Sequence, residues 1–320
     1  MRALVVAGTT ATGKTALALS LAKRFHGELV SADSRQIYQG LRVLSGQDVP
    51  PGVRPVFCKE VIHKSHRYPL VTYAIEGIPV WLYDALTPSQ PCNISLYRAL
   101  ALEAIRDISA RGKLPIIVGG AGLYIDAIFL PPETIDIPVN AALRHRLTLV
   151  PVPLLQKQLQ DIDAAKYGRM NNSDRNNPRR LVRALEVAVW QQRHPHVKPS
   201  GQESVEGLWI GLTRDSDELS SRIASRVDKR WHGAIEEVKR IRALASFAVR
   251  TSLGVAEITA YLDGALSERE AKEQWTRNEH AYALRQLRWF KKRQYIYWYN
   301  AASEDTQRLV VERVSGWYTK

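Results

Sequence analysis

An eight-residue stretch near the start of the chain constrains the fold more than any other feature. It consists of Gly8, Thr9, Thr10, Ala11, Thr12, Gly13, Lys14 and Thr15. An apolar, β-prone run precedes it at residues 3–7, and a helix-forming run follows at residues 16–23. Strand, glycine turn and helix in this order are typical of a P-loop, whose backbone N–H groups and helix N-terminus bind phosphate. We therefore predict that Lys14 neutralises phosphate oxygens and that the Thr15 hydroxyl binds Mg²⁺.

An acidic residue follows the next strand-like run. Leu29 and Val30 predict a short buried strand, and Asp33 lies just beyond its carboxyl end. Ligands of open α/β sheets bind outside these ends, so we expect Asp33 near whatever the P-loop binds. An aspartate at this point also suits the cap of a helix, and the two roles are compatible.

A later buried strand is predicted at residues 114–118, and it closes on Gly119 and Gly120. P-loop ATPases often place an acidic residue at this point, and the glycines therefore argue against nucleotide hydrolysis. Residues 49–78 contain several prolines and predict a loop or a small hairpin.

Three regions of the chain differ in the secondary structure that their sequences predict. Residues 1–133 alternate strand and helix signals, which predicts the first part of a P-loop NTPase-like α/β core with a parallel sheet. Residues 134–203 show only helical signals and predict an inserted helical domain, followed by a linker near residues 197–207. Residues 204–320 begin with a strand at 207–212 that completes the core, and they continue as basic helices up to about residue 299.

Basic residues gather on two of the predicted helices. Arg179, Arg180 and Arg183 lie off the apolar face of a helix that begins after Asn177 and Pro178. Arg285 and Arg288 lie on the long C-terminal helix. Such rows suit the phosphates of a nucleic acid, although a solvated helix surface is the simpler alternative.

The overall charge favours the first of these interpretations. The chain of 320 residues has 45 Lys+Arg against 32 Asp+Glu, a net charge of +13, which is typical of proteins that bind polyanions. Its 2 cysteines, Cys58 and Cys92, show no metal-binding spacing and suit a reducing cytoplasm. No apolar run approaches the length of a membrane span, and a monomer is the default expectation.

Six blocks in sequence resemble the tRNA dimethylallyltransferases, also called isopentenyl-tRNA transferases. The blocks cover residues 8–15, 31–41, 111–124, 180–187, 233–238 and 285–290. The resemblance implies that an exocyclic adenine amine beside the anticodon of tRNA attacks the first carbon of dimethylallyl diphosphate. It also implies that Asp33 acts as the general base, and that Lys14, Thr15 with Mg²⁺, and Arg222 stabilise the leaving diphosphate.

The resemblance further implies a set of residues that contact the substrate or the anticodon stem-loop. They are Ser34, Gln36, Ser45, Gly120, Arg179, Arg180, Arg183, Arg285, Gln286 and Arg288.

Some positions depart from the family pattern. Ala121 replaces a threonine, residues 42–48 differ from the usual motif, and residues 279–286 lack a usual arginine and a usual lysine. Three other interpretations therefore stay open: an adenylate isopentenyltransferase of the cytokinin type, a P-loop small-molecule kinase, and an inactive relative that binds tRNA. The basic helices count against the first, because a mononucleotide needs no extended basic surface.

Overall fold

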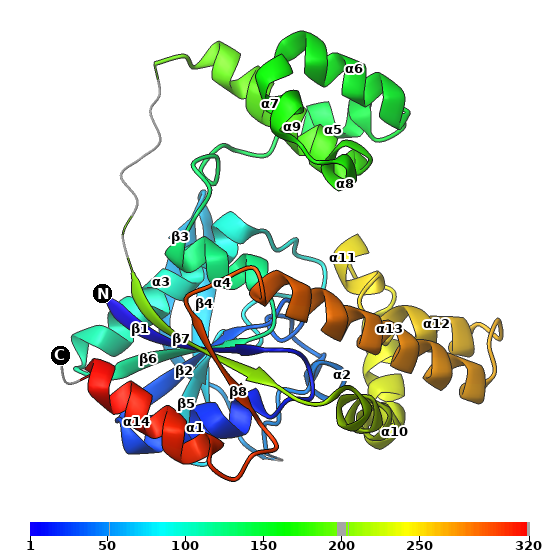
Figure 1. Cartoon of the computed structure of the whole chain (residues 1–320). Coiled ribbons are helices and arrows are strands. Elements are labelled where there is room, and N and C mark those ends of the chain that lie inside the picture. Colours follow the sequence, from blue (N-terminus) through cyan, green and yellow to red (C-terminus); the bar gives the residue numbers. More distant parts are fainter. Residues whose placement is uncertain (51, 197–202, 204, 319–320) are drawn as a thin grey trace. The chain divides into compact units, whose positions relative to one another are not determined.

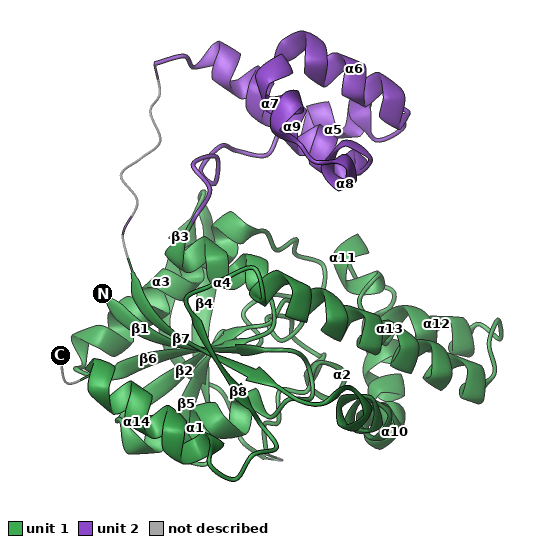
Figure 2. Ribbon diagram, viewed as in Figure 1, with its two compact units in different colours: residues 1–130, 204–320 green, residues 131–203 purple. Residues whose placement is uncertain are grey.

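The computed structural model describes residues 1–50, 52–196, 203 and 205–318. It divides into two compact units (Figure 2). We call residues 1–130 and 204–320 the core unit, and residues 131–203 the helical unit. Most of the linker predicted near residues 197–207 lies outside the described residues.

The core unit is built on one sheet (Figure 1). Among the described residues it has eight strands in the order β3-β4-β5-β2-β6-β1-β7-β8. The strands are β1 (Arg2–Gly8), β2 (Gly27–Ala32), β3 (Val56–His63), β4 (His66–Ile75), β5 (Ile78–Trp81), β6 (Leu114–Gly119), β7 (Glu206–Thr213) and β8 (Ile296–Asn300). The five neighbours β5-β2-β6-β1-β7 pair in parallel, as the alternation of strand and helix predicts. The predicted P-loop NTPase-like α/β class is confirmed.

Helices cover both faces of this sheet. The helices of the core unit are α1 (Lys14–Arg24), α2 (Arg42–Ser45), α3 (Ile94–Ala110), α4 (Gly122–Phe129), α10 (Ser216–Ile241), α11 (Phe247–Arg250), α12 (Val255–Leu262), α13 (Glu268–Phe290) and α14 (Thr306–Tyr318). Alternate residues of β1 enter two different apolar clusters, with Leu4 and Val6 on the side of α1 and α14. Ala3, Val5 and Ala7 face the side of α3 and α4 (Figure 1). A strand buried on both faces is uniformly apolar, and the sequence of β1 has this character.

One prediction about the core unit was right in part, and another was wrong. The small hairpin predicted as one alternative for residues 49–78 is present as β3-β4, and β5 extends it to a three-stranded antiparallel meander, because β-branched and aromatic residues fill these strands. The helical signal assumed to reach residue 299 ends at Phe290, and β8 then pairs in parallel with β7. The β-prone sequence Ile296-Tyr297-Trp298-Tyr299 explains that strand.

The helical unit has its own apolar core. Its helices are α5 (Ala141–Leu147), α6 (Val152–Ile162), α7 (Ala164–Arg169), α8 (Asn172–Arg175) and α9 (Pro178–Arg193). Leu155, Leu159 and Leu181 are fully buried between α6 and α9. The Asn177 side chain accepts hydrogen bonds from the first turn of α9, which confirms the predicted start of this helix.

Candidate active site

The P-loop forms the turn between β1 and α1. Gly13 has a φ of 92°, a left-handed conformation that favours glycine, and α1 begins at the next residue. The Thr12 hydroxyl donates a hydrogen bond to the Thr9 carbonyl oxygen at 2.8 Å, and both threonines are buried. The Lys14 ammonium group donates to the same carbonyl oxygen. These bonds hold the loop in one conformation at the carboxyl end of β1.

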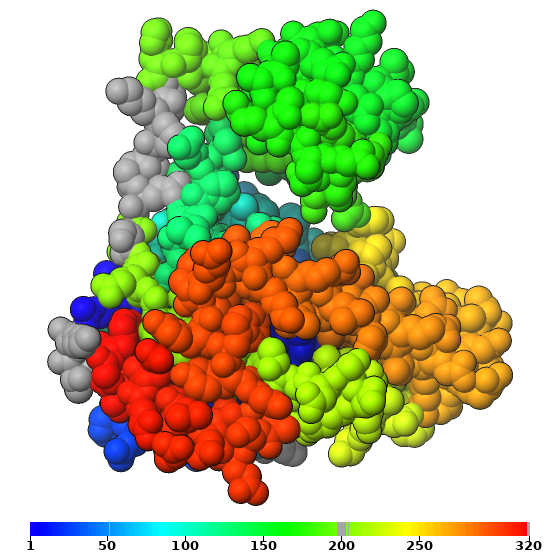
Figure 3. Space-filling view, viewed as in Figure 1, coloured from blue at the N-terminus to red at the C-terminus, as the bar shows by residue number. Residues whose placement is uncertain are grey.

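A cavity of about 280 Å³ opens beside this loop. Its walls are the P-loop, the end of β6, the segments that follow β2, β5 and β6, the end of α2 with the residues after it, one face of α10, and one residue of α13. Figure 3 shows a hollow between α13 (orange) and α10 (yellow-green), with atoms of the N-terminal region (dark blue) inside it. The cavity therefore lies at the carboxyl ends of the central strands, where ligands of α/β sheets bind.

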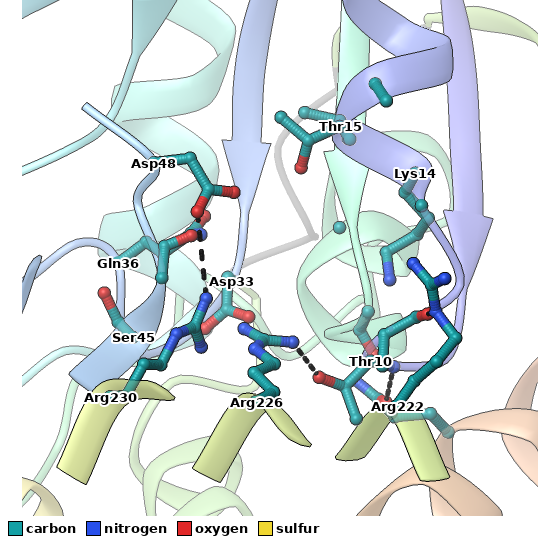
Figure 4. Close-up of a pocket in the computed structure, with 18 of the residues that line it drawn as sticks. Thr10, Lys14, Thr15, Asp33, Gln36, Ser45, Asp48, Arg222, Arg226 and Arg230 are labelled. Atoms are coloured by element: carbon teal, nitrogen blue, oxygen red, sulfur yellow. Dashed lines mark hydrogen bonds and ion pairs between the residues drawn. The ribbon is translucent and has the colours of Figure 1, made fainter. Parts of the chain in front are cut away.

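Cationic side chains dominate the cavity wall. Lys14, Arg222, Arg226 and Arg230 face it, whereas its two carboxylates are Asp33 and Asp48 (Figure 4). Burial, together with the charge of Arg226, lowers the pKa of Lys14 to about 7. Burial and Arg226 likewise lower the pKa of Arg230 to about 9. An anionic ligand would relieve this repulsion, so the electrostatics favour a polyanion such as a diphosphate.

Asp33 is held by a buried network that reaches α13. The backbone N–H of Arg35 donates to Asp33 Oδ1 at 2.8 Å. The guanidinium of Arg35 donates to Glu279 Oε1 at 2.9 Å, and Trp275 Nε1 donates to the same oxygen at 3.3 Å. Burial opposes ionisation of Glu279, but Arg35 and Arg226 hold its pKa below the usual range. The network fixes the carboxylate of Asp33 at the edge of the cavity.

Gln286 of α13 joins the P-loop to the end of β6. The Thr10 N–H donates to Gln286 Oε1 at 2.9 Å, and Gln286 Nε2 donates to the Gly120 carbonyl oxygen at 3.0 Å. The hydroxyl of Thr10 also has a protein partner, because Arg226 donates to it at 2.6 Å. Thr10 therefore shapes the wall, and both of its polar groups are already bonded to the protein.

The structure brings most of the predicted site residues together. Those that line the cavity are Thr10, Ala11, Gly13, Lys14, Thr15, Asp33, Gln36, Ser45, Gly120, Arg222 and Gln286. Gly8, Thr9 and Thr12 belong to the loop behind them, and Ser34 follows Asp33 outside the lining. Arg285 and Arg288 lie exposed on α13.

Of the three arginines predicted on α9, one has a different role. Arg183 donates through Nη2 to the carbonyl oxygens of Thr134 and Ile137 at 2.9 and 3.0 Å. It also forms an ion pair with the buried Glu186. Arg183 therefore stabilises the helical unit, and its contact with phosphate stays a prediction. Arg179 and Arg180 are exposed, although Arg180 also pairs with Asp174.

Sequence reasoning missed several residues of the cavity wall. Arg226 and Arg230 follow Arg222 at intervals of four, so they share one face of α10. This spacing is a usable signal, because residues four apart on a helix lie on the same face. Asp48 and Tyr83 left no such signal, since their place depends on how two loops fold against the sheet.

Oxygen ligands for a magnesium ion are few. Within the described residues, His, Cys, Asp and Glu side chains do not gather in a group of three or more that could hold a metal. The Thr15 hydroxyl and the Asp33 carboxylate do line the same cavity. Mg²⁺ is commonly bound by one or two protein oxygens together with substrate phosphates, and these residues fit that mode.

The fold and the cavity define a P-loop protein whose cationic pocket suits a phosphorylated ligand. A family model described as IPP transferase matches residues 72–293, and one described as isopentenyl transferase matches residues 1–56. The chain belongs to the tRNA dimethylallyltransferase family. The resemblance drawn from its motifs is therefore confirmed.

Named relatives match nearly the whole chain. A tRNA dimethylallyltransferase of Anoxybacillus flavithermus is 34% identical over 309 residues, which cover 95% of this chain and 91% of the relative. One of Geobacillus thermodenitrificans is 33% identical, with 97% of this chain and 94% of the relative covered.

Solved structures agree with this assignment. The full-length tRNA isopentenylpyrophosphate transferase of Bacillus halodurans matches with a TM-score of 0.67 and 29% identity, over 98% of this chain and 96% of that one. A eukaryotic dimethylallyltransferase acting on tRNA matches with a TM-score of 0.74 and 22% identity, over 98% and 77% of the two chains, which supports the fold alone. Among the described residues, no helix combines the length and the apolar character needed to cross a bilayer.

Proposed function

We propose that this protein transfers a dimethylallyl group from dimethylallyl diphosphate to the exocyclic amine of the adenosine next to the anticodon in tRNA. Family membership and the names of the relatives support the reaction. The observation that carries the proposal is the carboxylate of Asp33, which shares one cavity with Lys14 of the P-loop and with three arginines of α10.

The cavity residues support a direct displacement. The diphosphate would lie on the P-loop, where Lys14 and Arg222 stabilise the negative charge that develops as the carbon–oxygen bond breaks. The adenine nitrogen forms the new bond to the first carbon of the prenyl group. The proton of the amine passes to the carboxylate of Asp33, which acts as the general base. Diphosphate and a protonated Asp33 then remain.

The hydroxyl of Thr15 would hold Mg²⁺ together with oxygens of the diphosphate. This ion supplies further neutralisation of the leaving group when it is bound. Binding of the RNA would involve the exposed Arg179, Arg180, Arg285 and Arg288, because arginines of this kind contact RNA phosphates. A monomeric state and a cytoplasmic location remain predictions.

The test incubates the protein with unmodified tRNA, dimethylallyl diphosphate and Mg²⁺, and then analyses the nucleosides by mass spectrometry. We expect prenylated adenosine, and a loss of about 10²-fold or more in rate for Asp33→Asn, as the removal of a general base predicts. Asp305→Asn, at a carboxylate that is 64% exposed, serves as the control and should retain full activity.

Two results would overturn the proposal. One is the absence of prenylated adenosine on every tRNA tried, and the other is full activity of Asp33→Asn. Replacing tRNA with AMP separates the tRNA enzyme from an adenylate isopentenyltransferase, for which AMP would be the better acceptor.

A further inference from the structure

A second group of polar side chains lines the cavity away from the P-loop. Figure 4 shows Ser45, Arg230 and Asp48 on one side of Asp33, and Lys14 and Thr15 on the other. The hydrogen bonds described above for the P-loop do not involve Ser45, Asp48 or Arg230. The function of these three residues therefore requires a separate explanation.

The arginines of α10 divide between the two sides. Arg222 donates to the Ala11 carbonyl oxygen at 2.9 Å, and Arg226 donates to the Thr10 hydroxyl, so both bond to the P-loop. Arg230 instead approaches the Asp48 carboxylate at 3.8 Å. Eight residues of helix separate Arg222 from Arg230, a distance of about 12 Å along the axis. A diphosphate that is bound on the P-loop next to Arg222 therefore does not occupy Arg230, and Arg230 is available to bind another ligand.

The charge of Arg230 is poorly compensated. Its side chain is only 17% exposed, whereas its partner Asp48 is 62% exposed and separated from it by more than a hydrogen-bond length. The chain has no Cβ at Gly46, where one would lie 1.9 Å from Arg230 Nη2, so the guanidinium passes directly over the backbone. A guanidinium that is mostly removed from water is stabilised by an anion that compensates its charge.

Ser45 gives an independent indication of a ligand at the same place. It is 1% exposed, and its hydroxyl oxygen has no hydrogen-bond partner among the described residues. It nevertheless lines the cavity. Buried hydroxyl groups without partners are uncommon, and a ligand that accepts a hydrogen bond would satisfy this one.

The space beyond Arg230 indicates an extended ligand. A second hollow of about 230 Å³ shares Gly46, Asp48 and Arg230 with the main cavity, and Arg42 also lines it. A ligand at Arg230 can therefore continue past this residue, as a nucleotide chain would and a small prenyl group need not.

We propose that Arg230 and Ser45 bind a backbone phosphate of the acceptor RNA, next to the nucleotide that is modified. This inference rests on the proposed function, because a leaving group on the P-loop places the attacking amine on the opposite side of Asp33. Arg230 lies on that side, and a guanidinium with a hydroxyl group is a common pair of donors to a nucleic-acid phosphate.

The first test measures RNA binding by fluorescence anisotropy, with an anticodon stem-loop RNA and without dimethylallyl diphosphate. Arg230→Met should weaken binding by about tenfold, the loss expected for one phosphate contact of a buried arginine. Ser45→Ala should weaken it by about threefold, since it removes a single neutral hydrogen bond. The matched control is Lys229→Met, which removes the same charge from the same turn of α10 at an exposed position and should change binding by less than about twofold.

A second arm identifies the ligand group. The RNA carries a neutral methylphosphonate either 5′ or 3′ of the acceptor adenosine. One of the two substitutions should weaken binding to the wild-type protein by about tenfold and have no further effect on Arg230→Met. The KM for dimethylallyl diphosphate should be the same in Arg230→Met as in the wild type.

Three outcomes would overturn the assignment. They are RNA binding by Arg230→Met as tight as that of the control, methylphosphonate losses equal in wild type and variant, and an increased KM for dimethylallyl diphosphate in the variant. The last would assign Arg230 to the diphosphate. RNA binding is measured without dimethylallyl diphosphate, so it tests the phosphate subsite separately from the reaction. A protein that bound RNA with this pattern but formed no product would overturn the proposed function, and the assignment of the phosphate subsite would still hold.

Discussion

Replacing Glu279 with alanine should destabilise the core unit strongly. The Glu279 side chain is 11% exposed and that of its partner Arg35 is 8% exposed, so neither charge is well solvated. Removal of one partner of a buried ion pair typically costs about 3–5 kcal/mol, because the other charge stays buried. Trp275 Nε1 also loses its acceptor, which adds about 1 kcal/mol.

One neighbouring group offsets part of this cost. Arg35 Nε lies 3.9 Å from Asp33 Oδ1, so the guanidinium keeps a weaker carboxylate partner after Glu279 is removed. We therefore expect Glu279→Ala to lower the free energy of unfolding by about 3 kcal/mol, near the lower end of the typical range. Glu273→Ala is the control on the same helix, since Glu273 is 47% exposed and pairs with Arg269 at the surface. Its expected cost is about 0–1 kcal/mol.

The measurement is urea unfolding followed by tryptophan fluorescence. Of the 8 tryptophans, only Trp190 lies outside the core unit, so the signal reports mainly on the core. The reasoning would be refuted if Glu279→Ala lowered the free energy of unfolding by no more than Glu273→Ala does. That result would mean that Arg35 finds full compensation elsewhere and that the pair does not hold Asp33 in place.

Two further predictions concern ligand binding. Because the pKa of Lys14 is about 7, this side chain must take up a proton to bind an anion at higher pH. The inhibition constant of pyrophosphate should rise by up to about tenfold per pH unit from pH 7 to 9, and an equal slope in Lys14→Met would contradict this. A Cβ at Gly120 would lie 2.0 Å from Gln286 Nε2, so Gly120→Ala should break the link to the P-loop and raise the KM for dimethylallyl diphosphate about tenfold. Gly316→Ala, where nothing lies within 4 Å of the added carbon, is the control, and an equal KM in both variants would refute this role of Gln286.

The parts of the site that depend on local sequence were predictable. The P-loop requires two glycines, a lysine and a threonine at fixed spacing between a strand and a helix, and each of these features is readable in residues 3–23. Asp33 was predictable for a similar reason, because a short apolar run precedes it and parallel strands share one ligand edge.

The remaining parts depend on contacts between distant segments. Arg183 has the sequence position of a surface arginine, and only the return of residues 134–137 past α9 gives its guanidinium two carbonyl partners. The strand β8 lies at an edge of the described sheet and pairs there with β7, about ninety residues earlier in the chain. Local propensity favoured a strand there, but the aromatic residues also matched a helical interpretation.

The end of β6 explains why this P-loop suits a leaving group better than a nucleotide that is hydrolysed. A hydrolase places an acidic residue near this strand to bind the metal ion and to position chemistry at the phosphate. Here the strand ends at Gly119, and Gly120 accepts a hydrogen bond from Gln286, whose other amide atom binds the Thr10 N–H. The carboxylates of the cavity are instead Asp33, which follows β2, and Asp48, which follows α2. In the proposed reaction Asp33 takes the proton of the nucleophile, while Gln286 of α13 occupies the end of β6, where a hydrolase would carry its acid.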